Sequence, residues 1–126
     1  MRSITLSTVK DAEVILTNGN SVLVFGKTLW LFRIDGSFVV HQKAMRYPRK
    51  AAFLPNNTAI IEGNSTYFYV DLNDGSILWS TPRKKGISPP VAQFAVSPDG
   101  TVVFDMQRMK DRVIRIDRIC PGKQTV

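Results

Sequence analysis

The stretch TAIIEGNSTYFYVDLNDGSILW, residues 58–79, decides the fold class of this chain. It contains runs of apolar, β-branched and aromatic residues separated by polar turns rich in Gly, Asn, Ser and Asp. Runs of about four to eight such residues between turn-forming residues are typical of β-strands. Because no part of the chain keeps a helical period over more than about two turns, we expect an all-β protein.

The same order of strands and turns occurs three times along the chain. Ser21, Thr58 and Thr101 take equivalent positions, each after a turn of Asn, Gly, Pro or Asp that suits a tight hairpin. Units of four strands that repeat about every 40 residues indicate propeller blades. The matching segments are 13–25, 50–62 and 93–105 for the first two strands, 28–34, 66–72 and 112–116 for the third, and 37–41 and 76–80 for the fourth.

The third unit departs from the other two. Asp117-Arg118 lacks the glycine of the second turn, and residues 119–126 carry Pro121-Gly122 where a fourth strand would run. We therefore predict one domain over residues 1–126, a partial β-propeller of three antiparallel four-stranded meander blades with the third incomplete. The blades are expected at about residues 12–42, 50–81 and 91–126, with an extra N-terminal strand over residues 4–9.

Two short stretches resemble known propeller repeats. Residues 69–79 look like the quinoprotein-type repeat, with Asp71, the turn glycine Gly75 and then Trp79, and residues 94–101 (FAVSPDGT) resemble a hairpin of WD-type propellers. The resemblance implies a rigid scaffold whose loops bind other molecules. It does not imply the quinone cofactor, which in that family belongs to long chains with many blades, so we expect no cofactor.

Three blades are fewer than the roughly four to eight that close a propeller ring. Three arrangements remain open. Two chains form a homodimer that closes a six-bladed ring, the chain is a piece of a longer protein or pairs with another propeller chain, or the blades pack irregularly as a monomer. The resemblance also implies that the strand at residues 4–9 completes a blade without an outer strand, in this chain or a neighbouring one.

The charge is unevenly distributed. The chain has 17 Lys and Arg against 10 Asp and Glu, a formal net charge of +7, which favours acidic partners. In a meander, the second turn and the connection to the next unit lie at one edge of the sheet. That edge receives most of the basic residues, which are read either as an ordinary solvated surface or as an anion-binding face. The candidate binding residues are Arg46, Tyr47, Arg49, Lys50, Arg83, Lys84, Lys85, Arg108 and Lys110.

The sequence contains no recognisable catalytic or metal-binding motif. With His41 and Cys120 each the single residue of its type, we expect no metal site, no disulfide and no catalytic residue. Trp30 and Trp79 are interpreted as packing residues. Asp71, Asp105 and Asp117 lie near predicted strand ends, where Asp commonly caps turns. No stretch of the sequence is long and apolar enough to predict a membrane-spanning helix, and the lone cysteine favours a cytoplasmic location.

These observations leave three hypotheses of different classes. The first is a non-enzymatic propeller-type binding or assembly module whose basic loop face contacts an acidic protein partner. The second is a fragment or subunit of a larger propeller enzyme, such as a hydrolase, lyase or quinoprotein. The third is sequence-tolerant binding of nucleic acid, which predicts an affinity that falls steeply with salt.

Overall fold

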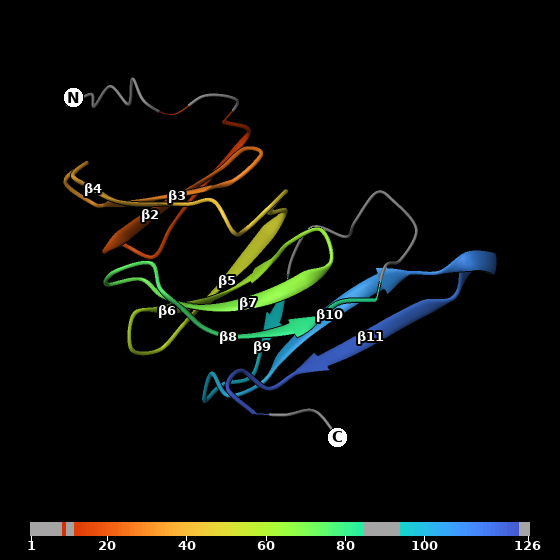
Figure 1. Cartoon of the computed structure of the whole chain (residues 1–126). Coiled ribbons are helices and arrows are strands. Elements are labelled where there is room, and N and C mark those ends of the chain that lie inside the picture. The colour runs from red at the N-terminus through yellow and green to blue at the C-terminus, as the bar shows by residue number, and fades with distance from the viewer. Residues whose placement is uncertain (1–8, 10–11, 85–93, 124–126) are drawn as a thin grey trace.

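The computed structural model describes residue 9, residues 12–84 and residues 94–123, and it shows three antiparallel sheets (Figure 1). The predicted strand over residues 4–9 therefore lies almost entirely outside the described residues, as does Lys85. Sheet 1 contains β1 (Val14–Thr17), β2 (Ser21–Phe25), β3 (Leu29–Arg33) and β4 (Phe38–Gln42). Sheet 2 contains β5 (Lys50–Leu54), β6 (Thr58–Glu62), β7 (Thr66–Asp71) and β8 (Ile77–Pro82). Sheet 3 contains β9 (Ala95–Val96), β10 (Val103–Arg108) and β11 (Ile114–Ile119), with a short 3-10 turn, η1 (Lys110–Arg112), between its last two strands.

Each sheet is a meander in which neighbours in sequence are neighbours in space. The predicted all-β class and the order of strands are thereby confirmed, and the third sheet has three strands among the described residues. Asn56 and Asn57 adopt positive φ angles in the β5–β6 turn, as the Asn-rich turn sequence predicts. Among the residues that the structure describes, no helix is long and apolar enough to cross a membrane.

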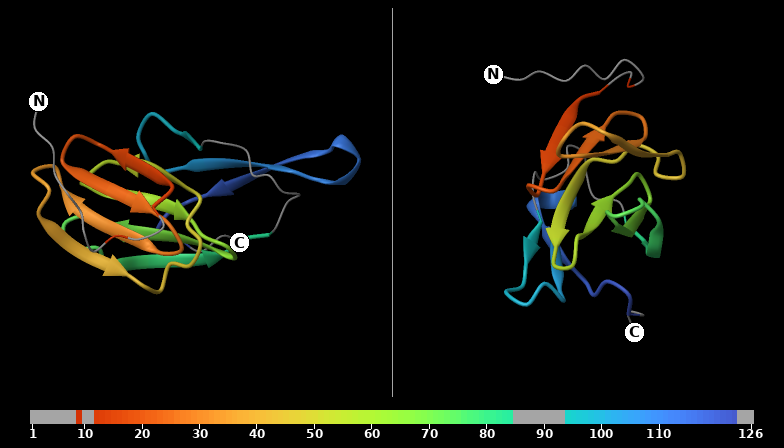
Figure 2. Two further views of the ribbon diagram at one scale, coloured as in Figure 1. Left: turned by 90° about the horizontal axis from the view of Figure 1, so that it is seen from above. Right: turned by 90° about the vertical axis from the view of Figure 1, so that its left-hand side faces the viewer.

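The three sheets are stacked with sheet 2 in the middle (Figures 1 and 2). Alternate residues of β6 point to opposite faces of the sheet, and all five are buried. Ala59 and Ile61 join the core shared with sheet 1, whereas Ile60 joins the core shared with sheet 3. A strand buried on both faces explains why this segment reads as a continuous apolar run.

Two glycines lie where neighbouring sheets approach closely. At Gly75, a Cβ would come within 2.1 Å of Cγ1 of Val40 in sheet 1, and the backbone has a φ of +77°. At Gly100, a Cβ would come within 2.3 Å of the Pro55 ring in sheet 2, with a φ of +73°. Each turn therefore requires glycine both for its left-handed conformation and for contact with the preceding sheet.

The third unit corrects two details of the predicted alignment. Its strands run over 103–108 and 114–119 rather than 101–105 and 112–116. Val96 pairs with Val103, so the β9–β10 connection is longer than the β5–β6 turn, where Leu54 pairs with Thr58. A shift of one residue reverses the face to which every side chain points. As a result Val103 joins Ile60 in the core between sheets 2 and 3, although the alignment made these two residues equivalent and Ile60 points away from the preceding sheet.

Candidate functional site

One edge of the stack gathers the predicted basic segments. The amide of Tyr47 donates to the carbonyl of Lys27 at 2.8 Å, and the amide of Asn64 donates to the carbonyl of Arg46 at 3.2 Å. The amide of Arg83 donates to the carbonyl of Ser65 at 2.9 Å. These bonds hold the β2–β3 turn, the β4–β5 connection, the β6–β7 turn and the end of β8 side by side.

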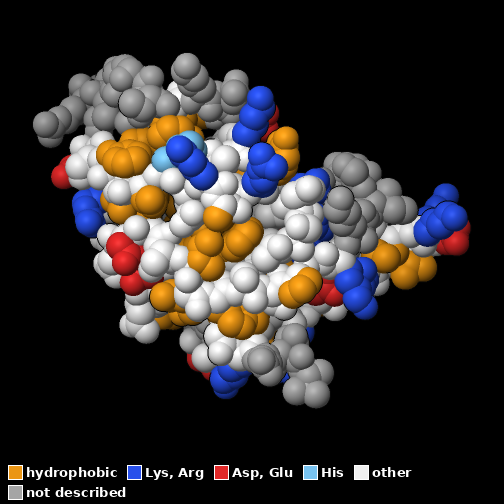
Figure 3. Space-filling view, in the orientation of Figure 1, with side chains coloured by type: hydrophobic (Ala, Val, Ile, Leu, Met, Phe, Trp, Pro, Cys, Tyr) orange, Lys and Arg blue, Asp and Glu red, His pale blue; other side chains and the backbone are white. Residues whose placement is uncertain are grey.

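Five exposed cationic side chains project from this edge, and we call them the basic edge. They are Lys27, Lys43, Arg46, Arg49 and Lys84. Figure 3 shows Lys and Arg side chains collected around the connection between sheets 1 and 2. The exposed carboxylate of Glu13 belongs to the same edge, because its amide donates to the carbonyl of Phe25 at the end of β2. The described part of the edge is thus predominantly positive.

Tyr47 is the aromatic side chain of the basic edge. It has a φ of +52° and is 53% exposed, so its ring stands out from the surface. A cleft of about 220 Å³ lies beside it, lined by Arg46, Asn64 and Phe68 among others. An exposed aromatic ring next to an arginine can stack on a planar group while the guanidinium binds an anion.

Two of the predicted binding residues are not on this surface. Lys50 and Arg83 are 5% and 7% exposed, so the expectation that they line a solvent-facing loop is wrong. Arg108 and Lys110 are exposed, but they belong to the β10–β11 hairpin, which extends beyond the other strands (Figure 2, left). The structure therefore unites Arg46, Tyr47, Arg49 and Lys84, and separates Arg108 and Lys110 from them.

Lys50 instead belongs to a buried charge cluster between sheets 2 and 3. Its Nζ atom lies 3.1 Å from Oε2 of Glu62 and forms an ion pair with Asp105 of β10. The Tyr67 hydroxyl donates to the second carboxylate oxygen of Asp105, which also accepts from Nε2 of Gln107 at 2.5 Å. We call Lys50, Glu62, Tyr67, Asp105 and Gln107 the charge cluster.

Arg83 closes one side of the charge cluster. Its guanidinium donates to the carbonyls of Gly63, at 3.1 Å, and Asn64, at 2.7 Å, and its Nε atom lies 3.7 Å from Oε1 of Glu62. These bonds hold the β6–β7 turn that supports the basic edge. Arg83 therefore has a structural role there, although sequence reasoning placed it among the ligand-binding residues.

Burial changes the ionisation of the charge cluster. It raises the pKa of Glu62 to about 7, and the nearby negative charge of Asp105 adds to this effect. The Lys50 ammonium, 3.1 Å from Oε2 of Glu62, lowers this pKa and offsets part of the effect. Bonds from Lys50 and Tyr67 overcome the burial of Asp105 and lower its pKa. The pKa of the Tyr67 hydroxyl is raised, mainly by burial, so this group stays a donor.

Sequence reasoning missed this cluster. Asp105 was interpreted as a turn cap, but it lies within β10 and is fully buried. Asp71, by contrast, does cap its turn, because its Oδ1 accepts from the Asn73 amide at 2.9 Å. Asp117 also departs from the prediction, since it lies within β11 and pairs with Arg115 at 2.9 Å. The sequence did contain one signal of a buried charge. Glu62 takes the position in β6 that the apolar Phe25 takes in the first unit.

The opposite edge of the stack is polar and is held by turn side chains. Asn18 donates to Asn57 at 3.2 Å, and Asn57 donates to Asn73 at 3.1 Å, which links the β1–β2, β5–β6 and β7–β8 turns. Hydrogen bonds from Ser97 and Thr101 lower the pKa of Asp99 to about 2. Its carboxylate is therefore occupied in holding the β9–β10 connection.

The remaining candidates for chemistry have packing roles. The His41 ring stacks on Trp30, with the ring centroids 3.6 Å apart, and its Nε2 lies 2.6 Å from the Thr28 hydroxyl. Burial lowers the pKa of His41, and the charge of Lys43 acts in the same direction. Trp79 packs against the core between sheets 2 and 3. In the described part of the chain, no group of three or more His, Cys, Asp or Glu residues could hold a metal ion.

Comparison with known proteins adds no family to this description. No protein-family model matches the chain, and no curated protein matches its sequence.

Proposed function

We propose that this chain is a propeller-type binding module that acts without catalysis and binds an acidic protein partner through its basic edge. The observation that carries the proposal is the alignment of Lys27, Arg46 and Lys84 from three different connections along one edge. Exposed charges of one sign speed the encounter with an oppositely charged partner and orient it.

Three further features support a binding role over a catalytic one. The buried carboxylates Glu62 and Asp105 are engaged with Lys50 and Tyr67 and are fully buried, so a substrate would not reach them. The backbone of the basic edge is held by hydrogen bonds between connections, which keeps the cations in place before a partner binds. The exposed Tyr47 ring adds an amphipathic contact of the kind enriched at interfaces.

The proposal is tested by reversing charge on the basic edge. Arg46→Glu/Arg49→Glu is compared with Lys110→Glu/Arg112→Glu, which changes the net charge equally on the projecting hairpin. Fluorescence anisotropy measures binding of a labelled polyglutamate peptide. We expect the first variant to weaken binding about tenfold or more, and the second to weaken it far less. Equal losses would show that only net charge matters and would refute the proposal.

A parallel titration with a labelled single-stranded oligonucleotide examines the nucleic-acid alternative. Acidic peptides are the expected ligand class, so the oligonucleotide should bind no more tightly than polyglutamate at moderate salt. Much tighter oligonucleotide binding, with log K falling linearly as log salt rises, would replace an acidic protein by nucleic acid as the partner.

A further inference from the structure

The outward face of sheet 3 leaves apolar side chains in solvent. Val103, Asp105 and Gln107 of β10 point toward sheet 2 and are buried, so the alternate residues point away. Met106 lies directly opposite Ile116 on β11, and these side chains are 37% and 65% exposed. Phe104 and Ile114 extend the same face and are also exposed. This apolar face has no partner among the described residues.

Within the stack, each apolar sheet face is covered by a face of the neighbouring sheet, which indicates that another sheet of this kind would cover the outward face of sheet 3. Sheet 2 covers the inner face of sheet 1 with Ala59 and Ile61, and sheet 3 covers the next face of sheet 2 with Val103. Each sheet thus uses one face toward the sheet before it and the other toward the sheet after it. The outward face of sheet 3 is therefore the end of the stack that a following sheet would cover. The outward face of sheet 1 is the opposite end, which a preceding sheet would cover.

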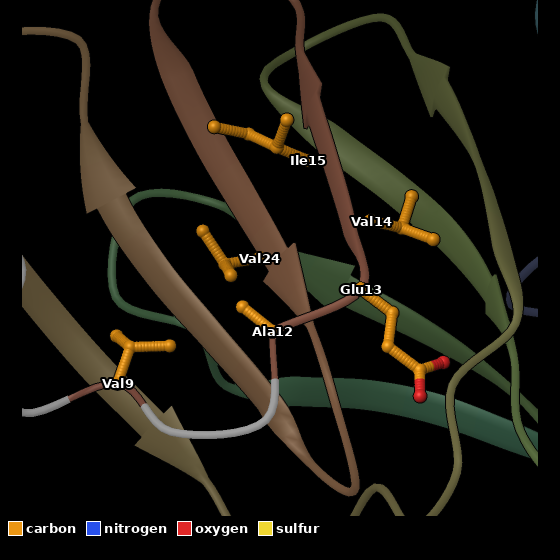
Figure 4. A pocket seen from close by; sticks show the side chains of 6 residues that line it. All are labelled: Val9, Ala12, Glu13, Val14, Ile15 and Val24. Carbon is orange, nitrogen blue, oxygen red and sulfur yellow. The ribbon is translucent and has the colours of Figure 1, made fainter.

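The outward face of sheet 1 is shaped to receive apolar side chains. A hollow of about 310 Å³ lies where this face meets the edge strand β1, lined by Ile15 and Val24 of the outward face and by Val9, Ala12, Glu13 and Val14 (Figure 4). Ile15 is 68% exposed at its rim. The hollow is large enough for a side chain such as Phe104 or Ile116 from another molecule.

Charge on the two outward faces is complementary at one edge of the stack. Arg108 lies on the outward face of sheet 3 opposite Ile114, at the edge where β10 turns into β11. Glu13 lies on the outward face of sheet 1 at the matching edge, beside the end of β2. If two molecules are stacked in the same sense as sheets 1, 2 and 3, these opposite charges come to the same side of the contact.

We propose that the outward face of sheet 3 docks on the outward face of sheet 1 of a second copy of this chain. The contact is head to tail, so it forms a closed pair if the rotation between copies closes, and an open chain otherwise. This self-association uses Met106, Ile116 and Arg108 on one side and Ile15 and Glu13 on the other. It does not depend on the basic edge or on an acidic partner.

The experiment uses Ile116→Glu and Ile15→Glu, one variant for each side of the contact, with Ile34→Glu as the control. Ile34 is 55% exposed in the β3–β4 turn, away from both faces. Sedimentation velocity over a wide concentration range measures association, and circular dichroism checks that each variant is folded. We expect Ile116→Glu and Ile15→Glu each to weaken association about tenfold to a hundredfold, whereas Ile34→Glu associates like the unaltered chain.

Mixing the two variants tests the head-to-tail geometry directly. Each variant keeps one intact face, so an equimolar mixture should form a heterodimer through the single remaining good contact. An isologous contact between two copies of sheet 3 predicts instead that Ile15→Glu associates normally and that mixing restores nothing. That result, or an unaltered chain that stays monomeric at every concentration, would overturn the proposal.

Discussion

The two interfaces between sheets use opposite chemistry at the same place in the repeat. At the end of the second strand, sheet 1 has a row of apolar cross-strand neighbours and sheet 2 a row of polar ones. These rows are Val14, Phe25 and Leu29 in sheet 1, and Lys50, Glu62 and Tyr67 in sheet 2. Phe25 and Glu62 are both fully buried, and each points toward the following sheet.

The difference teaches that a repeated fold does not dictate the chemistry of its interfaces. The contact between sheets 1 and 2 is stabilised by burial of apolar surface, which is insensitive to pH. The contact between sheets 2 and 3 adds ionised groups whose desolvation offsets much of their attraction. We therefore expect the second contact to be the more sensitive of the two to pH.

Removal of the Lys50 charge gives the largest expected effect. Lys50→Met leaves the carboxylates of Glu62 and Asp105 buried without their shared cation, which should lower the free energy of unfolding by about 3–5 kcal/mol at neutral pH. Urea unfolding followed by circular dichroism measures it. Leu31→Ala, in the apolar contact, serves as the comparison and should cost about 2–5 kcal/mol.

The pH dependence of these two losses separates the interfaces. The Lys50→Met loss should shrink as pH falls toward 5, because the orphaned carboxylates can take up protons, while the Leu31→Ala loss stays constant. A Lys50→Met loss that does not change with pH would mean that the ion pairs contribute little to the contact.

Glu62 itself should make stability fall as pH rises. Its pKa is raised from 4.5 in the unfolded chain to about 7 in the folded one, so the folded state binds more protons between these values. Stability is therefore lost as pH rises from about 4.5 to 7, by an amount on the order of 3 kcal/mol. Glu62→Gln removes this titration, so we expect the wild type to lose stability relative to this variant across that range.

The comparison at each pH isolates Glu62 from the other titrating groups. The pKa of His41 is lowered from 6.5, so His41 acts in the opposite sense and increases stability as pH rises to 6.5. Its contribution is common to the wild type and Glu62→Gln and cancels in their difference. Parallel stability profiles for the two proteins between pH 5 and 8 would contradict a raised pKa at Glu62.

The smallest expected effect is that of Tyr67→Phe. This change removes a hydrogen bond to the buried carboxylate of Asp105 and should cost about 1–3 kcal/mol. Tyr69→Phe, two residues along the same strand, removes the hydroxyl of a tyrosine that is not a member of the charge cluster and is the matched control. Thermal unfolding measures both variants. An equal loss in the two would show that the Tyr67 hydroxyl stabilises the contact no more than an ordinary tyrosine hydroxyl does.

Much of the strand order could be predicted because its causes are local. The alternation of apolar residues and the Asn and Gly turns lie within a few residues of one another, and they placed β5, β6 and their turn at the observed bounds. The basic edge was predicted in part, since Arg46 and Arg49 are exposed there. The propeller resemblance, with no family match, remains a prediction.

What only the tertiary structure decided were the partners of charged residues and the face of each strand in the third unit. Lys50 follows a run of basic residues and reads as surface, but one of its ion pairs is with Asp105, 55 positions further along the chain. A pattern of neighbouring residues cannot predict a partner so far away in the sequence. The longer β9–β10 connection shifts the register by one residue, which turns Asp105 inward toward that lysine. Sequence thus determined the strands and turns, because these depend on neighbours, whereas burial of a charge depends on which sheet packs against it.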